Sequence, residues 1–523
     1  MWDKELSWIR GFARDLEARP ALPEASPEDV EEHSRQVVHL QDLFSLLASL
    51  PASRRPEISA WDDEVAPLWR RLFAKGDDID RYVLGDLWAS ILMDSGEIER
   101  ATRALVGVVA SARNFYLFDE GLARCQEARE LCAGKSIVPL AQLINVEGSI
   151  HSIQGDFEAA ERSYNDALAM AMPLDDKDFQ IWIGATKSDF LSQEQFNLIE
   201  TWLEKAETAP PPERNLLAEQ VRSKLAALDA MRLSAGFSRF RSVSVAQLAI
   251  VERDFAKARQ ALLSLGEADN IVEGPYKYPL LTVRCRLESR ICQLEGDWPG
   301  AYEWVRGALK EGLRHAFPTE EQMVLAEALK VLKGLGASRQ SRPEAGLVSD
   351  LVQLLEDKDW YTGRSHSQSV GALARRVGEV LNHAFETAMD LGRLNMAGLL
   401  HDIGKLRCPW SLLNKIGPIT PRERALLHQH SEHGEAILRT IGMDDIAAIV
   451  EQHHETMNGS GYPKGVPPQP MGAVVAVCDI YEASVTPNRR YKEPKAPEAI
   501  IEELKTLSGI LYWPPAVEAL ARL

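Results

Sequence analysis

Helical periodicity over the N-terminal three-fifths of the chain is the feature that most constrains its fold. Leu, Ala, Glu and Arg dominate this region, and apolar residues recur at steps of three and four. Runs in which apolar and polar residues alternate, as a half-buried strand requires, are scarce. We therefore expect an all-α protein whose N-terminal region is built of helices.

A loose repeat recurs within this region: a glycine or polar turn, an acidic residue, a large apolar residue, then alanines at helical spacing. The clearest copy comprises Gly148, Gly155, Asp156, Phe157, Ala160, Tyr164, Ala167 and Leu168. Weaker copies begin at Gly96, Asp254 and Gly296. The clearest copy resembles a tetratricopeptide repeat, in which helix pairs stack into a solenoid. The resemblance predicts an α-helical repeat region or, at the least, irregular helical hairpins, which either simply pack together or form a surface for a protein partner.

Length and composition are those of a multidomain globular protein. A chain of 523 residues is too long for one ordinary core and suggests about two to four domains. No apolar run approaches the roughly 20 residues that a membrane helix needs. The N-terminus also lacks the basic start and apolar core of an export signal. We therefore expect a cytoplasmic protein that does not bind membranes.

Charge and cysteine usage exclude further classes. The net charge of -18 argues against binding to DNA, RNA or anionic lipid, because such partners require a basic face. A small anionic substrate remains possible, since a few local cations can hold a phosphate. The six cysteines include no CxxC pair, which disfavours a disulfide framework or zinc knuckle and fits a reducing compartment.

A domain boundary is predicted where the helical periodicity lapses. Small and polar residues cluster from Gly336 to Pro343. We therefore divide the chain into a helical repeat region, residues 1–335, a linker, residues 336–345, and a second domain, residues 346–523.

Histidines concentrate in the second domain, where eight of the twelve lie between positions 366 and 454. Seven residues there stand in contexts typical of metal ligands: His366, His401, Asp402, His430, His453, His454 and Asp479. Imidazole and carboxylate are the ligands that borderline divalent metals prefer, and this set is larger than one ion needs. For His428 and His433, which flank His430, we expect a solvated helix face.

The segment HDIGK follows directly on an apolar stretch. An adjacent His401 and Asp402 at the end of a buried helix can bind one metal through the imidazole while the carboxylate, which has two oxygens, bridges to a second. Lys405 lies one turn further on, where its ammonium group could meet a phosphate oxygen. An isolated HD pair would be nearly uninformative, so the neighbouring histidines give the motif its weight.

The order of these motifs resembles that of the HD-GYP family, a branch of the HD phosphohydrolases. The matching elements are His366, HDIGK at 401–405, His430 four residues before Gly434, HHE at 453–455, GSGYP at 459–463, and Asp479. The resemblance covers roughly residues 355–523, about a third of the chain. It implies an all-helical domain with two or three iron or manganese ions. It also implies phosphodiesterase activity on cyclic di-GMP or another cyclic dinucleotide, giving the linear pGpG or GMP.

The resemblance also implies roles for individual residues. The metal ligands would be His366, His401, Asp402 as the bridge, His430, His453, His454 and Asp479. The substrate-binding residues would be Lys405, Gly461, Tyr462, Pro463, Arg489 and Lys492. Asp402 and Lys405 would act in catalysis. Two cations would activate a shared water to hydroxide near neutral pH and neutralise the charge of the phosphodiester.

Several positions depart from the family pattern. Thr362 stands where members with a third metal carry a glutamate, so we expect two divalent ions, iron or manganese. Asn458 replaces a usual aspartate, and the usual Asp-Ala-Leu-Thr after Asp479 reads Glu-Ala-Ser-Val at 482–485. One extra residue precedes Arg489.

Two functions remain open at this point. The first is a cyclic di-GMP phosphodiesterase regulated by its helical repeat region. The alternative is a slow or inactive cyclic di-GMP receptor that signals through protein interactions. A general HD nucleotidase acting on mononucleotides is a third hypothesis, against which the GYP loop argues.

Overall fold

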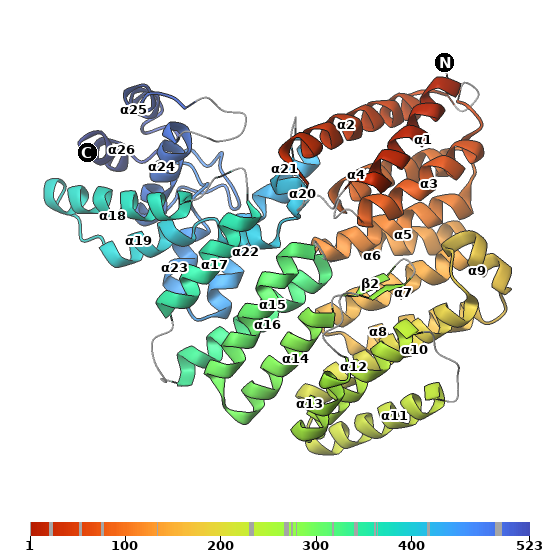
Figure 1. Ribbon diagram of the computed structural model, residues 1–523. Helices are drawn as coiled ribbons and strands as arrows, with labels where there is room; N and C mark the ends of the chain where they lie inside the picture. Colours follow the sequence, from red (N-terminus) through yellow and green to blue (C-terminus); the bar gives the residue numbers. More distant parts are fainter. Residues whose placement is uncertain are drawn as a thin grey trace. The chain divides into compact units, whose positions relative to one another are not determined.

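The computed structural model describes most of the chain. The described residues are 2–19, 25–51, 55–74, 78–132, 134–229, 235–265, 271–273, 276–278, 280–315, 318–338, 344–359, 362, 365–415, 419–486 and 494–523. These residues form two compact units, Met1–Glu321 and Gln322–Leu523, and helices make up both (Figure 1). The predicted all-α fold is confirmed, apart from one short pair of strands in the first unit.

The first unit is a succession of helices. They are α1 (Trp2–Ala18), α2 (Pro27–Ser49), α3 (Ile58–Ala74), α4 (Asp78–Asp94), α5 (Ile98–Asn114), α6 (Phe118–Cys132), α7 (Val138–Gln154), α8 (Phe157–Ala171), α9 (Asp176–Ile183), α10 (Lys187–Thr208), α11 (Pro211–Asp229), α12 (Ala235–Val251), α13 (Phe255–Leu263), α14 (Leu280–Glu295) and α15 (Trp298–His315). Consecutive helices pack as hairpins, α4 with α5, α7 with α8, α12 with α13 and α14 with α15.

The predicted repeat marks the turns of these hairpins. Gly96, Gly155, Asp254 and Gly296 each lie between the two helices of one pair, and the three glycines have φ near +80°, which favours glycine. In the clearest copy, a Cβ at Gly148 would lie 2.7 Å from the Tyr164 ring. The absence of that Cβ lets α7 and α8 approach closely, as the sequence predicts.

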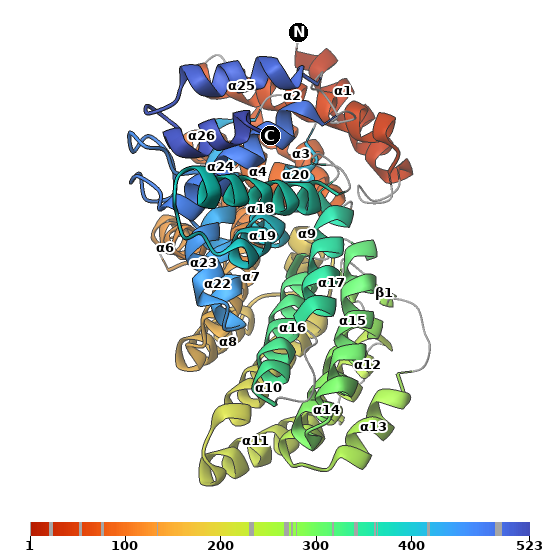
Figure 2. The same cartoon turned by 90° about the vertical axis from the view of Figure 1, so that its left-hand side faces the viewer.

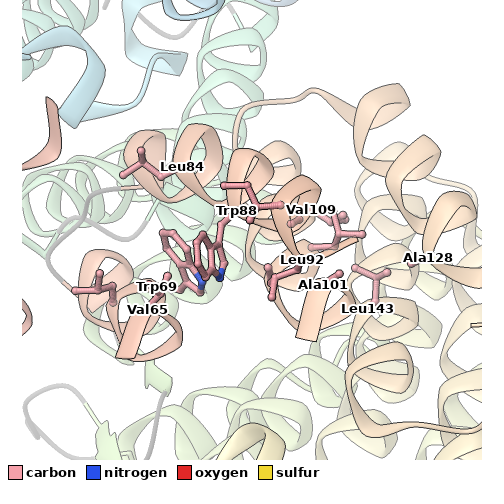
Figure 3. Packing of buried hydrophobic residues seen from close by; sticks show 14 of the residues in the cluster. Val65, Trp69, Leu84, Trp88, Leu92, Ala101, Val109, Ala128 and Leu143 are labelled. Carbon is pink, nitrogen blue, oxygen red and sulfur yellow. The ribbon is translucent and has the colours of Figure 1, made fainter. Parts of the chain in front are cut away.

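The core of the first unit holds large aromatic side chains. Figure 3 shows Trp69 and Trp88 packed with Val65, Leu84 and Leu92. Trp88 is fully buried, and its ring lies 4.7 Å from that of Phe44. Since aromatic side chains bury the most apolar area, this contact stabilises the unit strongly.

The two strands lie between α13 and α14. Strand β1 (Ile271–Glu273) pairs antiparallel with β2 (Tyr276–Tyr278). Their β-branched and aromatic residues favour extended backbone. They are a short exception in a unit otherwise made of helices.

The boundary between the units differs from the predicted linker at 336–345. Helix α16 (Pro318–Ser338) starts in the first unit, and its Leu325 and Leu329 belong to the core of the second. Helix α17 (Glu344–Lys358) follows, and residues 339–343 lie outside the described part of the chain. The apolar face of α16 therefore places the boundary after Glu321, where the sequence pattern is still helical.

The second unit contains the histidine-rich motifs. Its further elements are α18 (His366–Ala384), α19 (Leu391–Leu400), the 3-10 helix η3 (Ile403–Arg407), α20 (Trp410–Leu413), α21 (Pro421–His428), α22 (His430–Thr440), α23 (Asp444–Val450), α24 (Pro470–Val485), α25 (Pro497–Thr506) and α26 (Pro514–Ala521). Helices α18 and α19 lie side by side (Figure 2). A Cβ at Gly398 would be 2.7 Å from Gly371 Cα, so both glycines are needed for this close approach.

Helix α24 is the central helix of the second unit. It packs against α18, α19, α23, α25 and α26, and its Val474, Val475, Val477 and Cys478 are buried. This apolar surround holds the following residue, Asp479, at a fixed position.

Among the helices that the structure describes, none combines the length and the apolar character that a membrane span requires.

Candidate metal centre

Five segments of the second unit bring the seven predicted ligands together. His366 is the first residue of α18, His401 and Asp402 join α19 to η3, His430 begins α22, His453 and His454 follow α23, and Asp479 lies within α24. All but Asp479 stand where a helix begins or ends. Side chains at such positions can converge on one point from several directions.

Close packing explains why the HDIGK motif has a glycine at position 404. A Cβ at Gly404 would overlap the carbonyl oxygen of His430 and would lie 2.5 Å from Gly434 N. Only glycine therefore lets η3 meet the start of α22. This contact places Asp402 beside His430.

The first group of ligand atoms comes from His366, His401 and Asp479. One atom from each residue lies within 4.8 Å of the others. The Asp479 Oδ1 atom is 3.2 Å from His366 Nε2 and 3.5 Å from His401 Nε2. These three residues can hold one cation.

The second group comprises His430, His453 and His454, whose ligand atoms also lie within 4.8 Å of one another. His430 Nε2 and His453 Nε2 are 3.2 Å apart. Burial is the main cause that lowers the pKa of His430 to about 3 and of His453 to about 4. Burial also puts the pKa of His454 well below its usual range. These rings are therefore neutral.

Asp402 lies between the two groups. Its Oδ2 is 3.2 Å from His401 Nε2, and its Oδ1 is 3.4 Å from His430 Nε2. Burial disfavours its charge, but His401 and Lys405 outweigh burial and hold the pKa of Asp402 well below its usual range. One ionised oxygen thus faces each group, as a bridging ligand requires.

Three of the histidines have their ring orientation fixed by the backbone. In each, Nδ1 contacts the carbonyl oxygen three residues earlier: His401 with Gly398 at 2.8 Å, His430 with Leu427 at 2.6 Å and His453 with Val450 at 2.6 Å. A carbonyl can only accept a hydrogen bond, so Nδ1 carries a proton in each of these rings. The neutral rings of His430 and His453 therefore present a lone pair on Nε2.

This donor set fits divalent cations. In the second group, the lone pairs of two Nε2 atoms face each other at 3.2 Å, an arrangement that a cation between them would stabilise. In the first group, His401 Nε2 is buried and makes no well-oriented hydrogen bond to any residue that the structure describes. Burial disfavours its charge, yet Asp402 and Asp479 raise the pKa of His401 to about 10. The excess negative charge there suits a metal ion.

Lys405 is held by two carboxylates at the edge of the centre. Its Nζ donates to Asp402 Oδ2 at 2.8 Å and to Asp359 Oδ2 at 3.0 Å. Burial disfavours its charge, but Asp359 and Asp402 outweigh burial and raise the pKa of Lys405. The protonated Nζ of Lys405 therefore lies beside Asp402, the residue between the two groups of candidate ligands.

The GYP loop covers the second group. The Tyr462 ring stacks on His428, with centroids 3.7 Å apart and planes at 6°, and lies 4.7 Å from the His454 ring. Gly461 packs tightly, since a Cβ there would be 2.4 Å from the carbonyl oxygen of His454 and 2.6 Å from Glu455 Cα. The loop is thus fixed against the candidate ligands.

Two buried glutamates were missed as functional residues by sequence reasoning. Glu455 accepts hydrogen bonds from the backbone N–H groups of Lys464, Gly465 and Val466, and so anchors the loop. Glu482 contacts His366 Nδ1. The place of Glu455 within HHE was a signal of importance, whereas Glu482 stood out only as a departure from the family pattern.

The solvated helix face expected for His428 and His433 is not what the structure shows. Neither His428 nor His433 lies on an exposed face, because the first is stacked on Tyr462 and burial lowers the pKa of the second to about 4. Their helical spacing did not show that the GYP loop and η3 cover them. Arg489 and Lys492, predicted to bind substrate, lie outside the described residues.

Comparison with known proteins agrees with this geometry. The family model of the HD domain matches residues 350–512. Over 179 residues the chain is 38% identical to a cyclic di-GMP phosphodiesterase of Thermotoga maritima, covering 33% of this chain and 47% of that protein. Over 180 residues it is 33% identical to 3'3'-cGAMP-specific phosphodiesterase 2 of Vibrio cholerae, covering 33% of this chain and 34% of that protein.

A third relative is a response regulator of Xanthomonas campestris pv. campestris named as a cyclic di-GMP phosphodiesterase. It is 29% identical over 272 residues, which are 50% of this chain and 64% of that protein. The chain thus spans less than two thirds of each of these relatives. The match of residues 350–512 to the HD domain model, and the similarity to proteins named as cyclic di-GMP phosphodiesterases, agree with the HD-GYP resemblance of the motifs.

Proposed function

We propose that this protein is a metal-dependent phosphodiesterase that hydrolyses cyclic di-GMP, to pGpG or GMP, in its HD domain. The observation that carries the proposal is the pair of ligand groups with Asp402 between them. Two ions spaced by one carboxylate are the arrangement that phosphodiester hydrolysis commonly uses.

Each group would hold one divalent ion, iron or manganese. The first ion would be bound by His366, His401 and Asp479, the second by His430, His453 and His454, with Asp402 shared. When bound, the ions would polarise the phosphodiester and lower the pKa of a water molecule between them.

The side chains around the ligands would orient the substrate. Lys405 would donate from its protonated Nζ to a nonbridging phosphate oxygen, exchanging a carboxylate partner for the phosphate. Tyr462, with Gly461 and Pro463, would form the wall of the site next to His454. Arg489 and Lys492 would hold the second phosphate of the cyclic dinucleotide.

The relatives favour a cyclic dinucleotide as substrate. Their names specify cyclic di-GMP or 3'3'-cGAMP, two substrates that share the same diester ring and differ in one base. We choose cyclic di-GMP because the relative with the highest identity among those described is named for it.

Anaerobic turnover of cyclic di-GMP by the full-length protein loaded with Fe(II) or Mn(II) tests this function. We expect hydrolysis with about two ions bound per chain. The Asp402→Ala variant should lose turnover and bind fewer ions, because it lacks the carboxylate between the two groups. 3'3'-cGAMP serves as the competing substrate.

Other outcomes would change the assignment. Binding of metal and cyclic di-GMP without hydrolysis would overturn the enzyme in favour of a receptor. Faster turnover of 3'3'-cGAMP would reassign the substrate and keep the reaction. Turnover of mononucleotides alone would make the protein a nucleotidase.

We further propose that the helical hairpins of the first unit bind a protein partner that regulates the HD domain. The stacked helix pairs support this, since such repeats offer extended surfaces. A partner isolated by cross-linking to the full-length protein should change turnover when it is added to the purified enzyme. Unchanged turnover with every recovered protein would contradict this role.

A further inference from the structure

One histidine of the centre is oriented differently from the others. His401, His430 and His453 each direct Nδ1 to a carbonyl on their own segment. His366 is the first residue of α18 and follows Ser365, whose φ is 72°. It therefore has no preceding helical turn of α18 to supply such a carbonyl.

A glutamate takes the place of that carbonyl. Glu482 Oε2 forms a hydrogen bond with His366 Nδ1. Glu482 lies on α24, one turn after Asp479, whose Oδ1 is 3.2 Å from the other nitrogen of the same ring. Helix α24 thus contacts both nitrogen atoms of His366 through two acidic side chains.

Glu482 is itself held in place. Its side chain is buried, and its second oxygen accepts a hydrogen bond from Thr486 Oγ1 at 2.6 Å. The carboxylate is therefore preorganised before any ion binds. Because it lies on the Nδ1 side of the ring, it faces away from the ligand atom Nε2.

We propose that Glu482 is the positioning residue of the first group: it keeps the Nδ1 proton of His366 in place and directs Nε2 at the ion. This inference rests on the metal centre of the proposed function. A carboxylate behind a ligating histidine fixes the tautomer and makes the ring a stronger donor, and its loss typically weakens metal affinity by about 10–100-fold.

The proposal predicts an effect on one ion only. The Glu482 carboxylate contacts a ligand of the first group, while His430 and His453, in the second group, have backbone acceptors of their own. Loss of the carboxylate should therefore lower affinity at one site and leave the other unchanged. A general loss of structure would affect both sites together.

Titration of the metal-free full-length protein with Mn(II) alone, without substrate, tests this. The wild type should bind two ions per chain. Glu482→Ala should bind one ion as tightly as the wild type and the other about 10–100-fold more weakly. Glu482→Gln, whose amide oxygen can still accept from Nδ1, should lose less. Ser484→Ala, a buried position on the same helix, is the matched control and should bind like the wild type.

The outcomes separate this inference from the proposed function. A wild type that binds neither Mn(II) nor, in the same titration under anaerobic conditions, Fe(II) would overturn both. Two ions at wild-type affinity in Glu482→Ala would overturn only the role of Glu482. If the alanine variant does not fold, the nearly isosteric Glu482→Gln decides: weakening at one site supports the role, and equal weakening at both sites, or at neither, refutes it.

Discussion

Buried polar groups have different surroundings in the two units. In the first unit, Asp62 is 1% exposed and is paired with Arg100 and Arg103. In the second unit, His430 and His453 direct unprotonated nitrogen atoms at each other. A buried charge that stabilises the fold is paired with groups of opposite charge. In the candidate ligand set, by contrast, two nitrogen lone pairs face each other, and a cation bound between them would stabilise the arrangement.

Two buried histidines make the same contrast. Burial lowers the pKa of His33 to about 4, and its Nε2 lies 3.9 Å from Oδ2 of Asp80. His401 is equally buried, but carboxylates at 3.2 and 3.5 Å raise its pKa to about 10. The number and distance of the carboxylates decide the protonation state, so burial alone does not identify a functional histidine.

The largest expected effect comes from adding one methyl group at Gly404. Its Cβ would overlap backbone atoms of the segment that starts at His430, and backbone atoms cannot rotate away. We expect Gly404→Ala to lower the free energy of unfolding by about 3 kcal/mol or more. Displacement of Asp402 from His430 should reduce kcat at least about 100-fold.

The same substitution in the first unit is the control. A Cβ at Gly11, within α1, would meet no atom within 4 Å. Gly11→Ala should therefore be neutral or stabilising by up to about 1 kcal/mol. Urea unfolding and turnover measured on both variants check the pair. A Gly404→Ala protein with normal stability and turnover would show that η3 can move away from α22 at no cost.

Asp62→Ala should produce the next largest effect. Its removal leaves two arginines without their buried partner, so we expect the free energy of unfolding to fall by about 3 kcal/mol. Metal content should not change, because the first unit contributes none of the candidate ligands. Urea unfolding and metal analysis measure the two quantities.

Asp63 provides a matched comparison for that variant. It also pairs with Arg100, at 2.6 Å, but its side chain is 66% exposed. Asp63→Ala should therefore cost under about 1 kcal/mol. Equal effects of the two variants would mean that burial does not distinguish these two carboxylates.

The sequence predicted the helices, and it singled out residues that the structure places close together, because both have local signals. Helical spacing fixed the hairpin around Gly155, and the order of motifs singled out the seven residues that the structure brings together. The limit between the units was missed because α16 is continuous across it, and only tertiary packing assigns Leu325 to the second core.

Contacts between distant segments were beyond sequence reasoning. Glu482 and His366 are 116 positions apart, and nothing local indicates that they meet. The stacking of His428 on Tyr462 likewise depends on how the GYP loop folds back. The short strands at 271–278 were missed because three-residue runs carry too little periodicity.

A pH experiment sharpens the contrast between the histidines. Because the folded state lowers the pKa of His33 from its ordinary 6.5 to about 4, its neutral form stabilises the fold above pH 6.5. The unfolded chain takes up the proton first as pH falls, so this stability is lost between about pH 6.5 and 4. From pH 7 to pH 5 the loss should be about 2 kcal/mol.

Urea unfolding at both pH values, compared with His33→Gln, isolates this contribution. The variant should lose about 2 kcal/mol less than the wild type over the same interval. His39→Gln is the control, because the His39 side chain is 50% exposed. If His33→Gln and the wild type have the same pH dependence, another group causes the loss.

The smallest expected effect is that of replacing His428, which tests whether this histidine is a ligand of the candidate metal centre. His428 lies two residues before His430, but it contacts Tyr462 with its ring face, as a packing residue does. His428→Ala should lower the free energy of unfolding by about 1 kcal/mol and raise KM a few-fold, since stacked pairs contribute about that much. Metal content should stay at the wild-type value, and His428→Phe, which keeps a flat ring against Tyr462, should restore most of the stability. Loss of one ion from His428→Ala would instead place His428 among the ligands and would contradict its assignment as a packing residue.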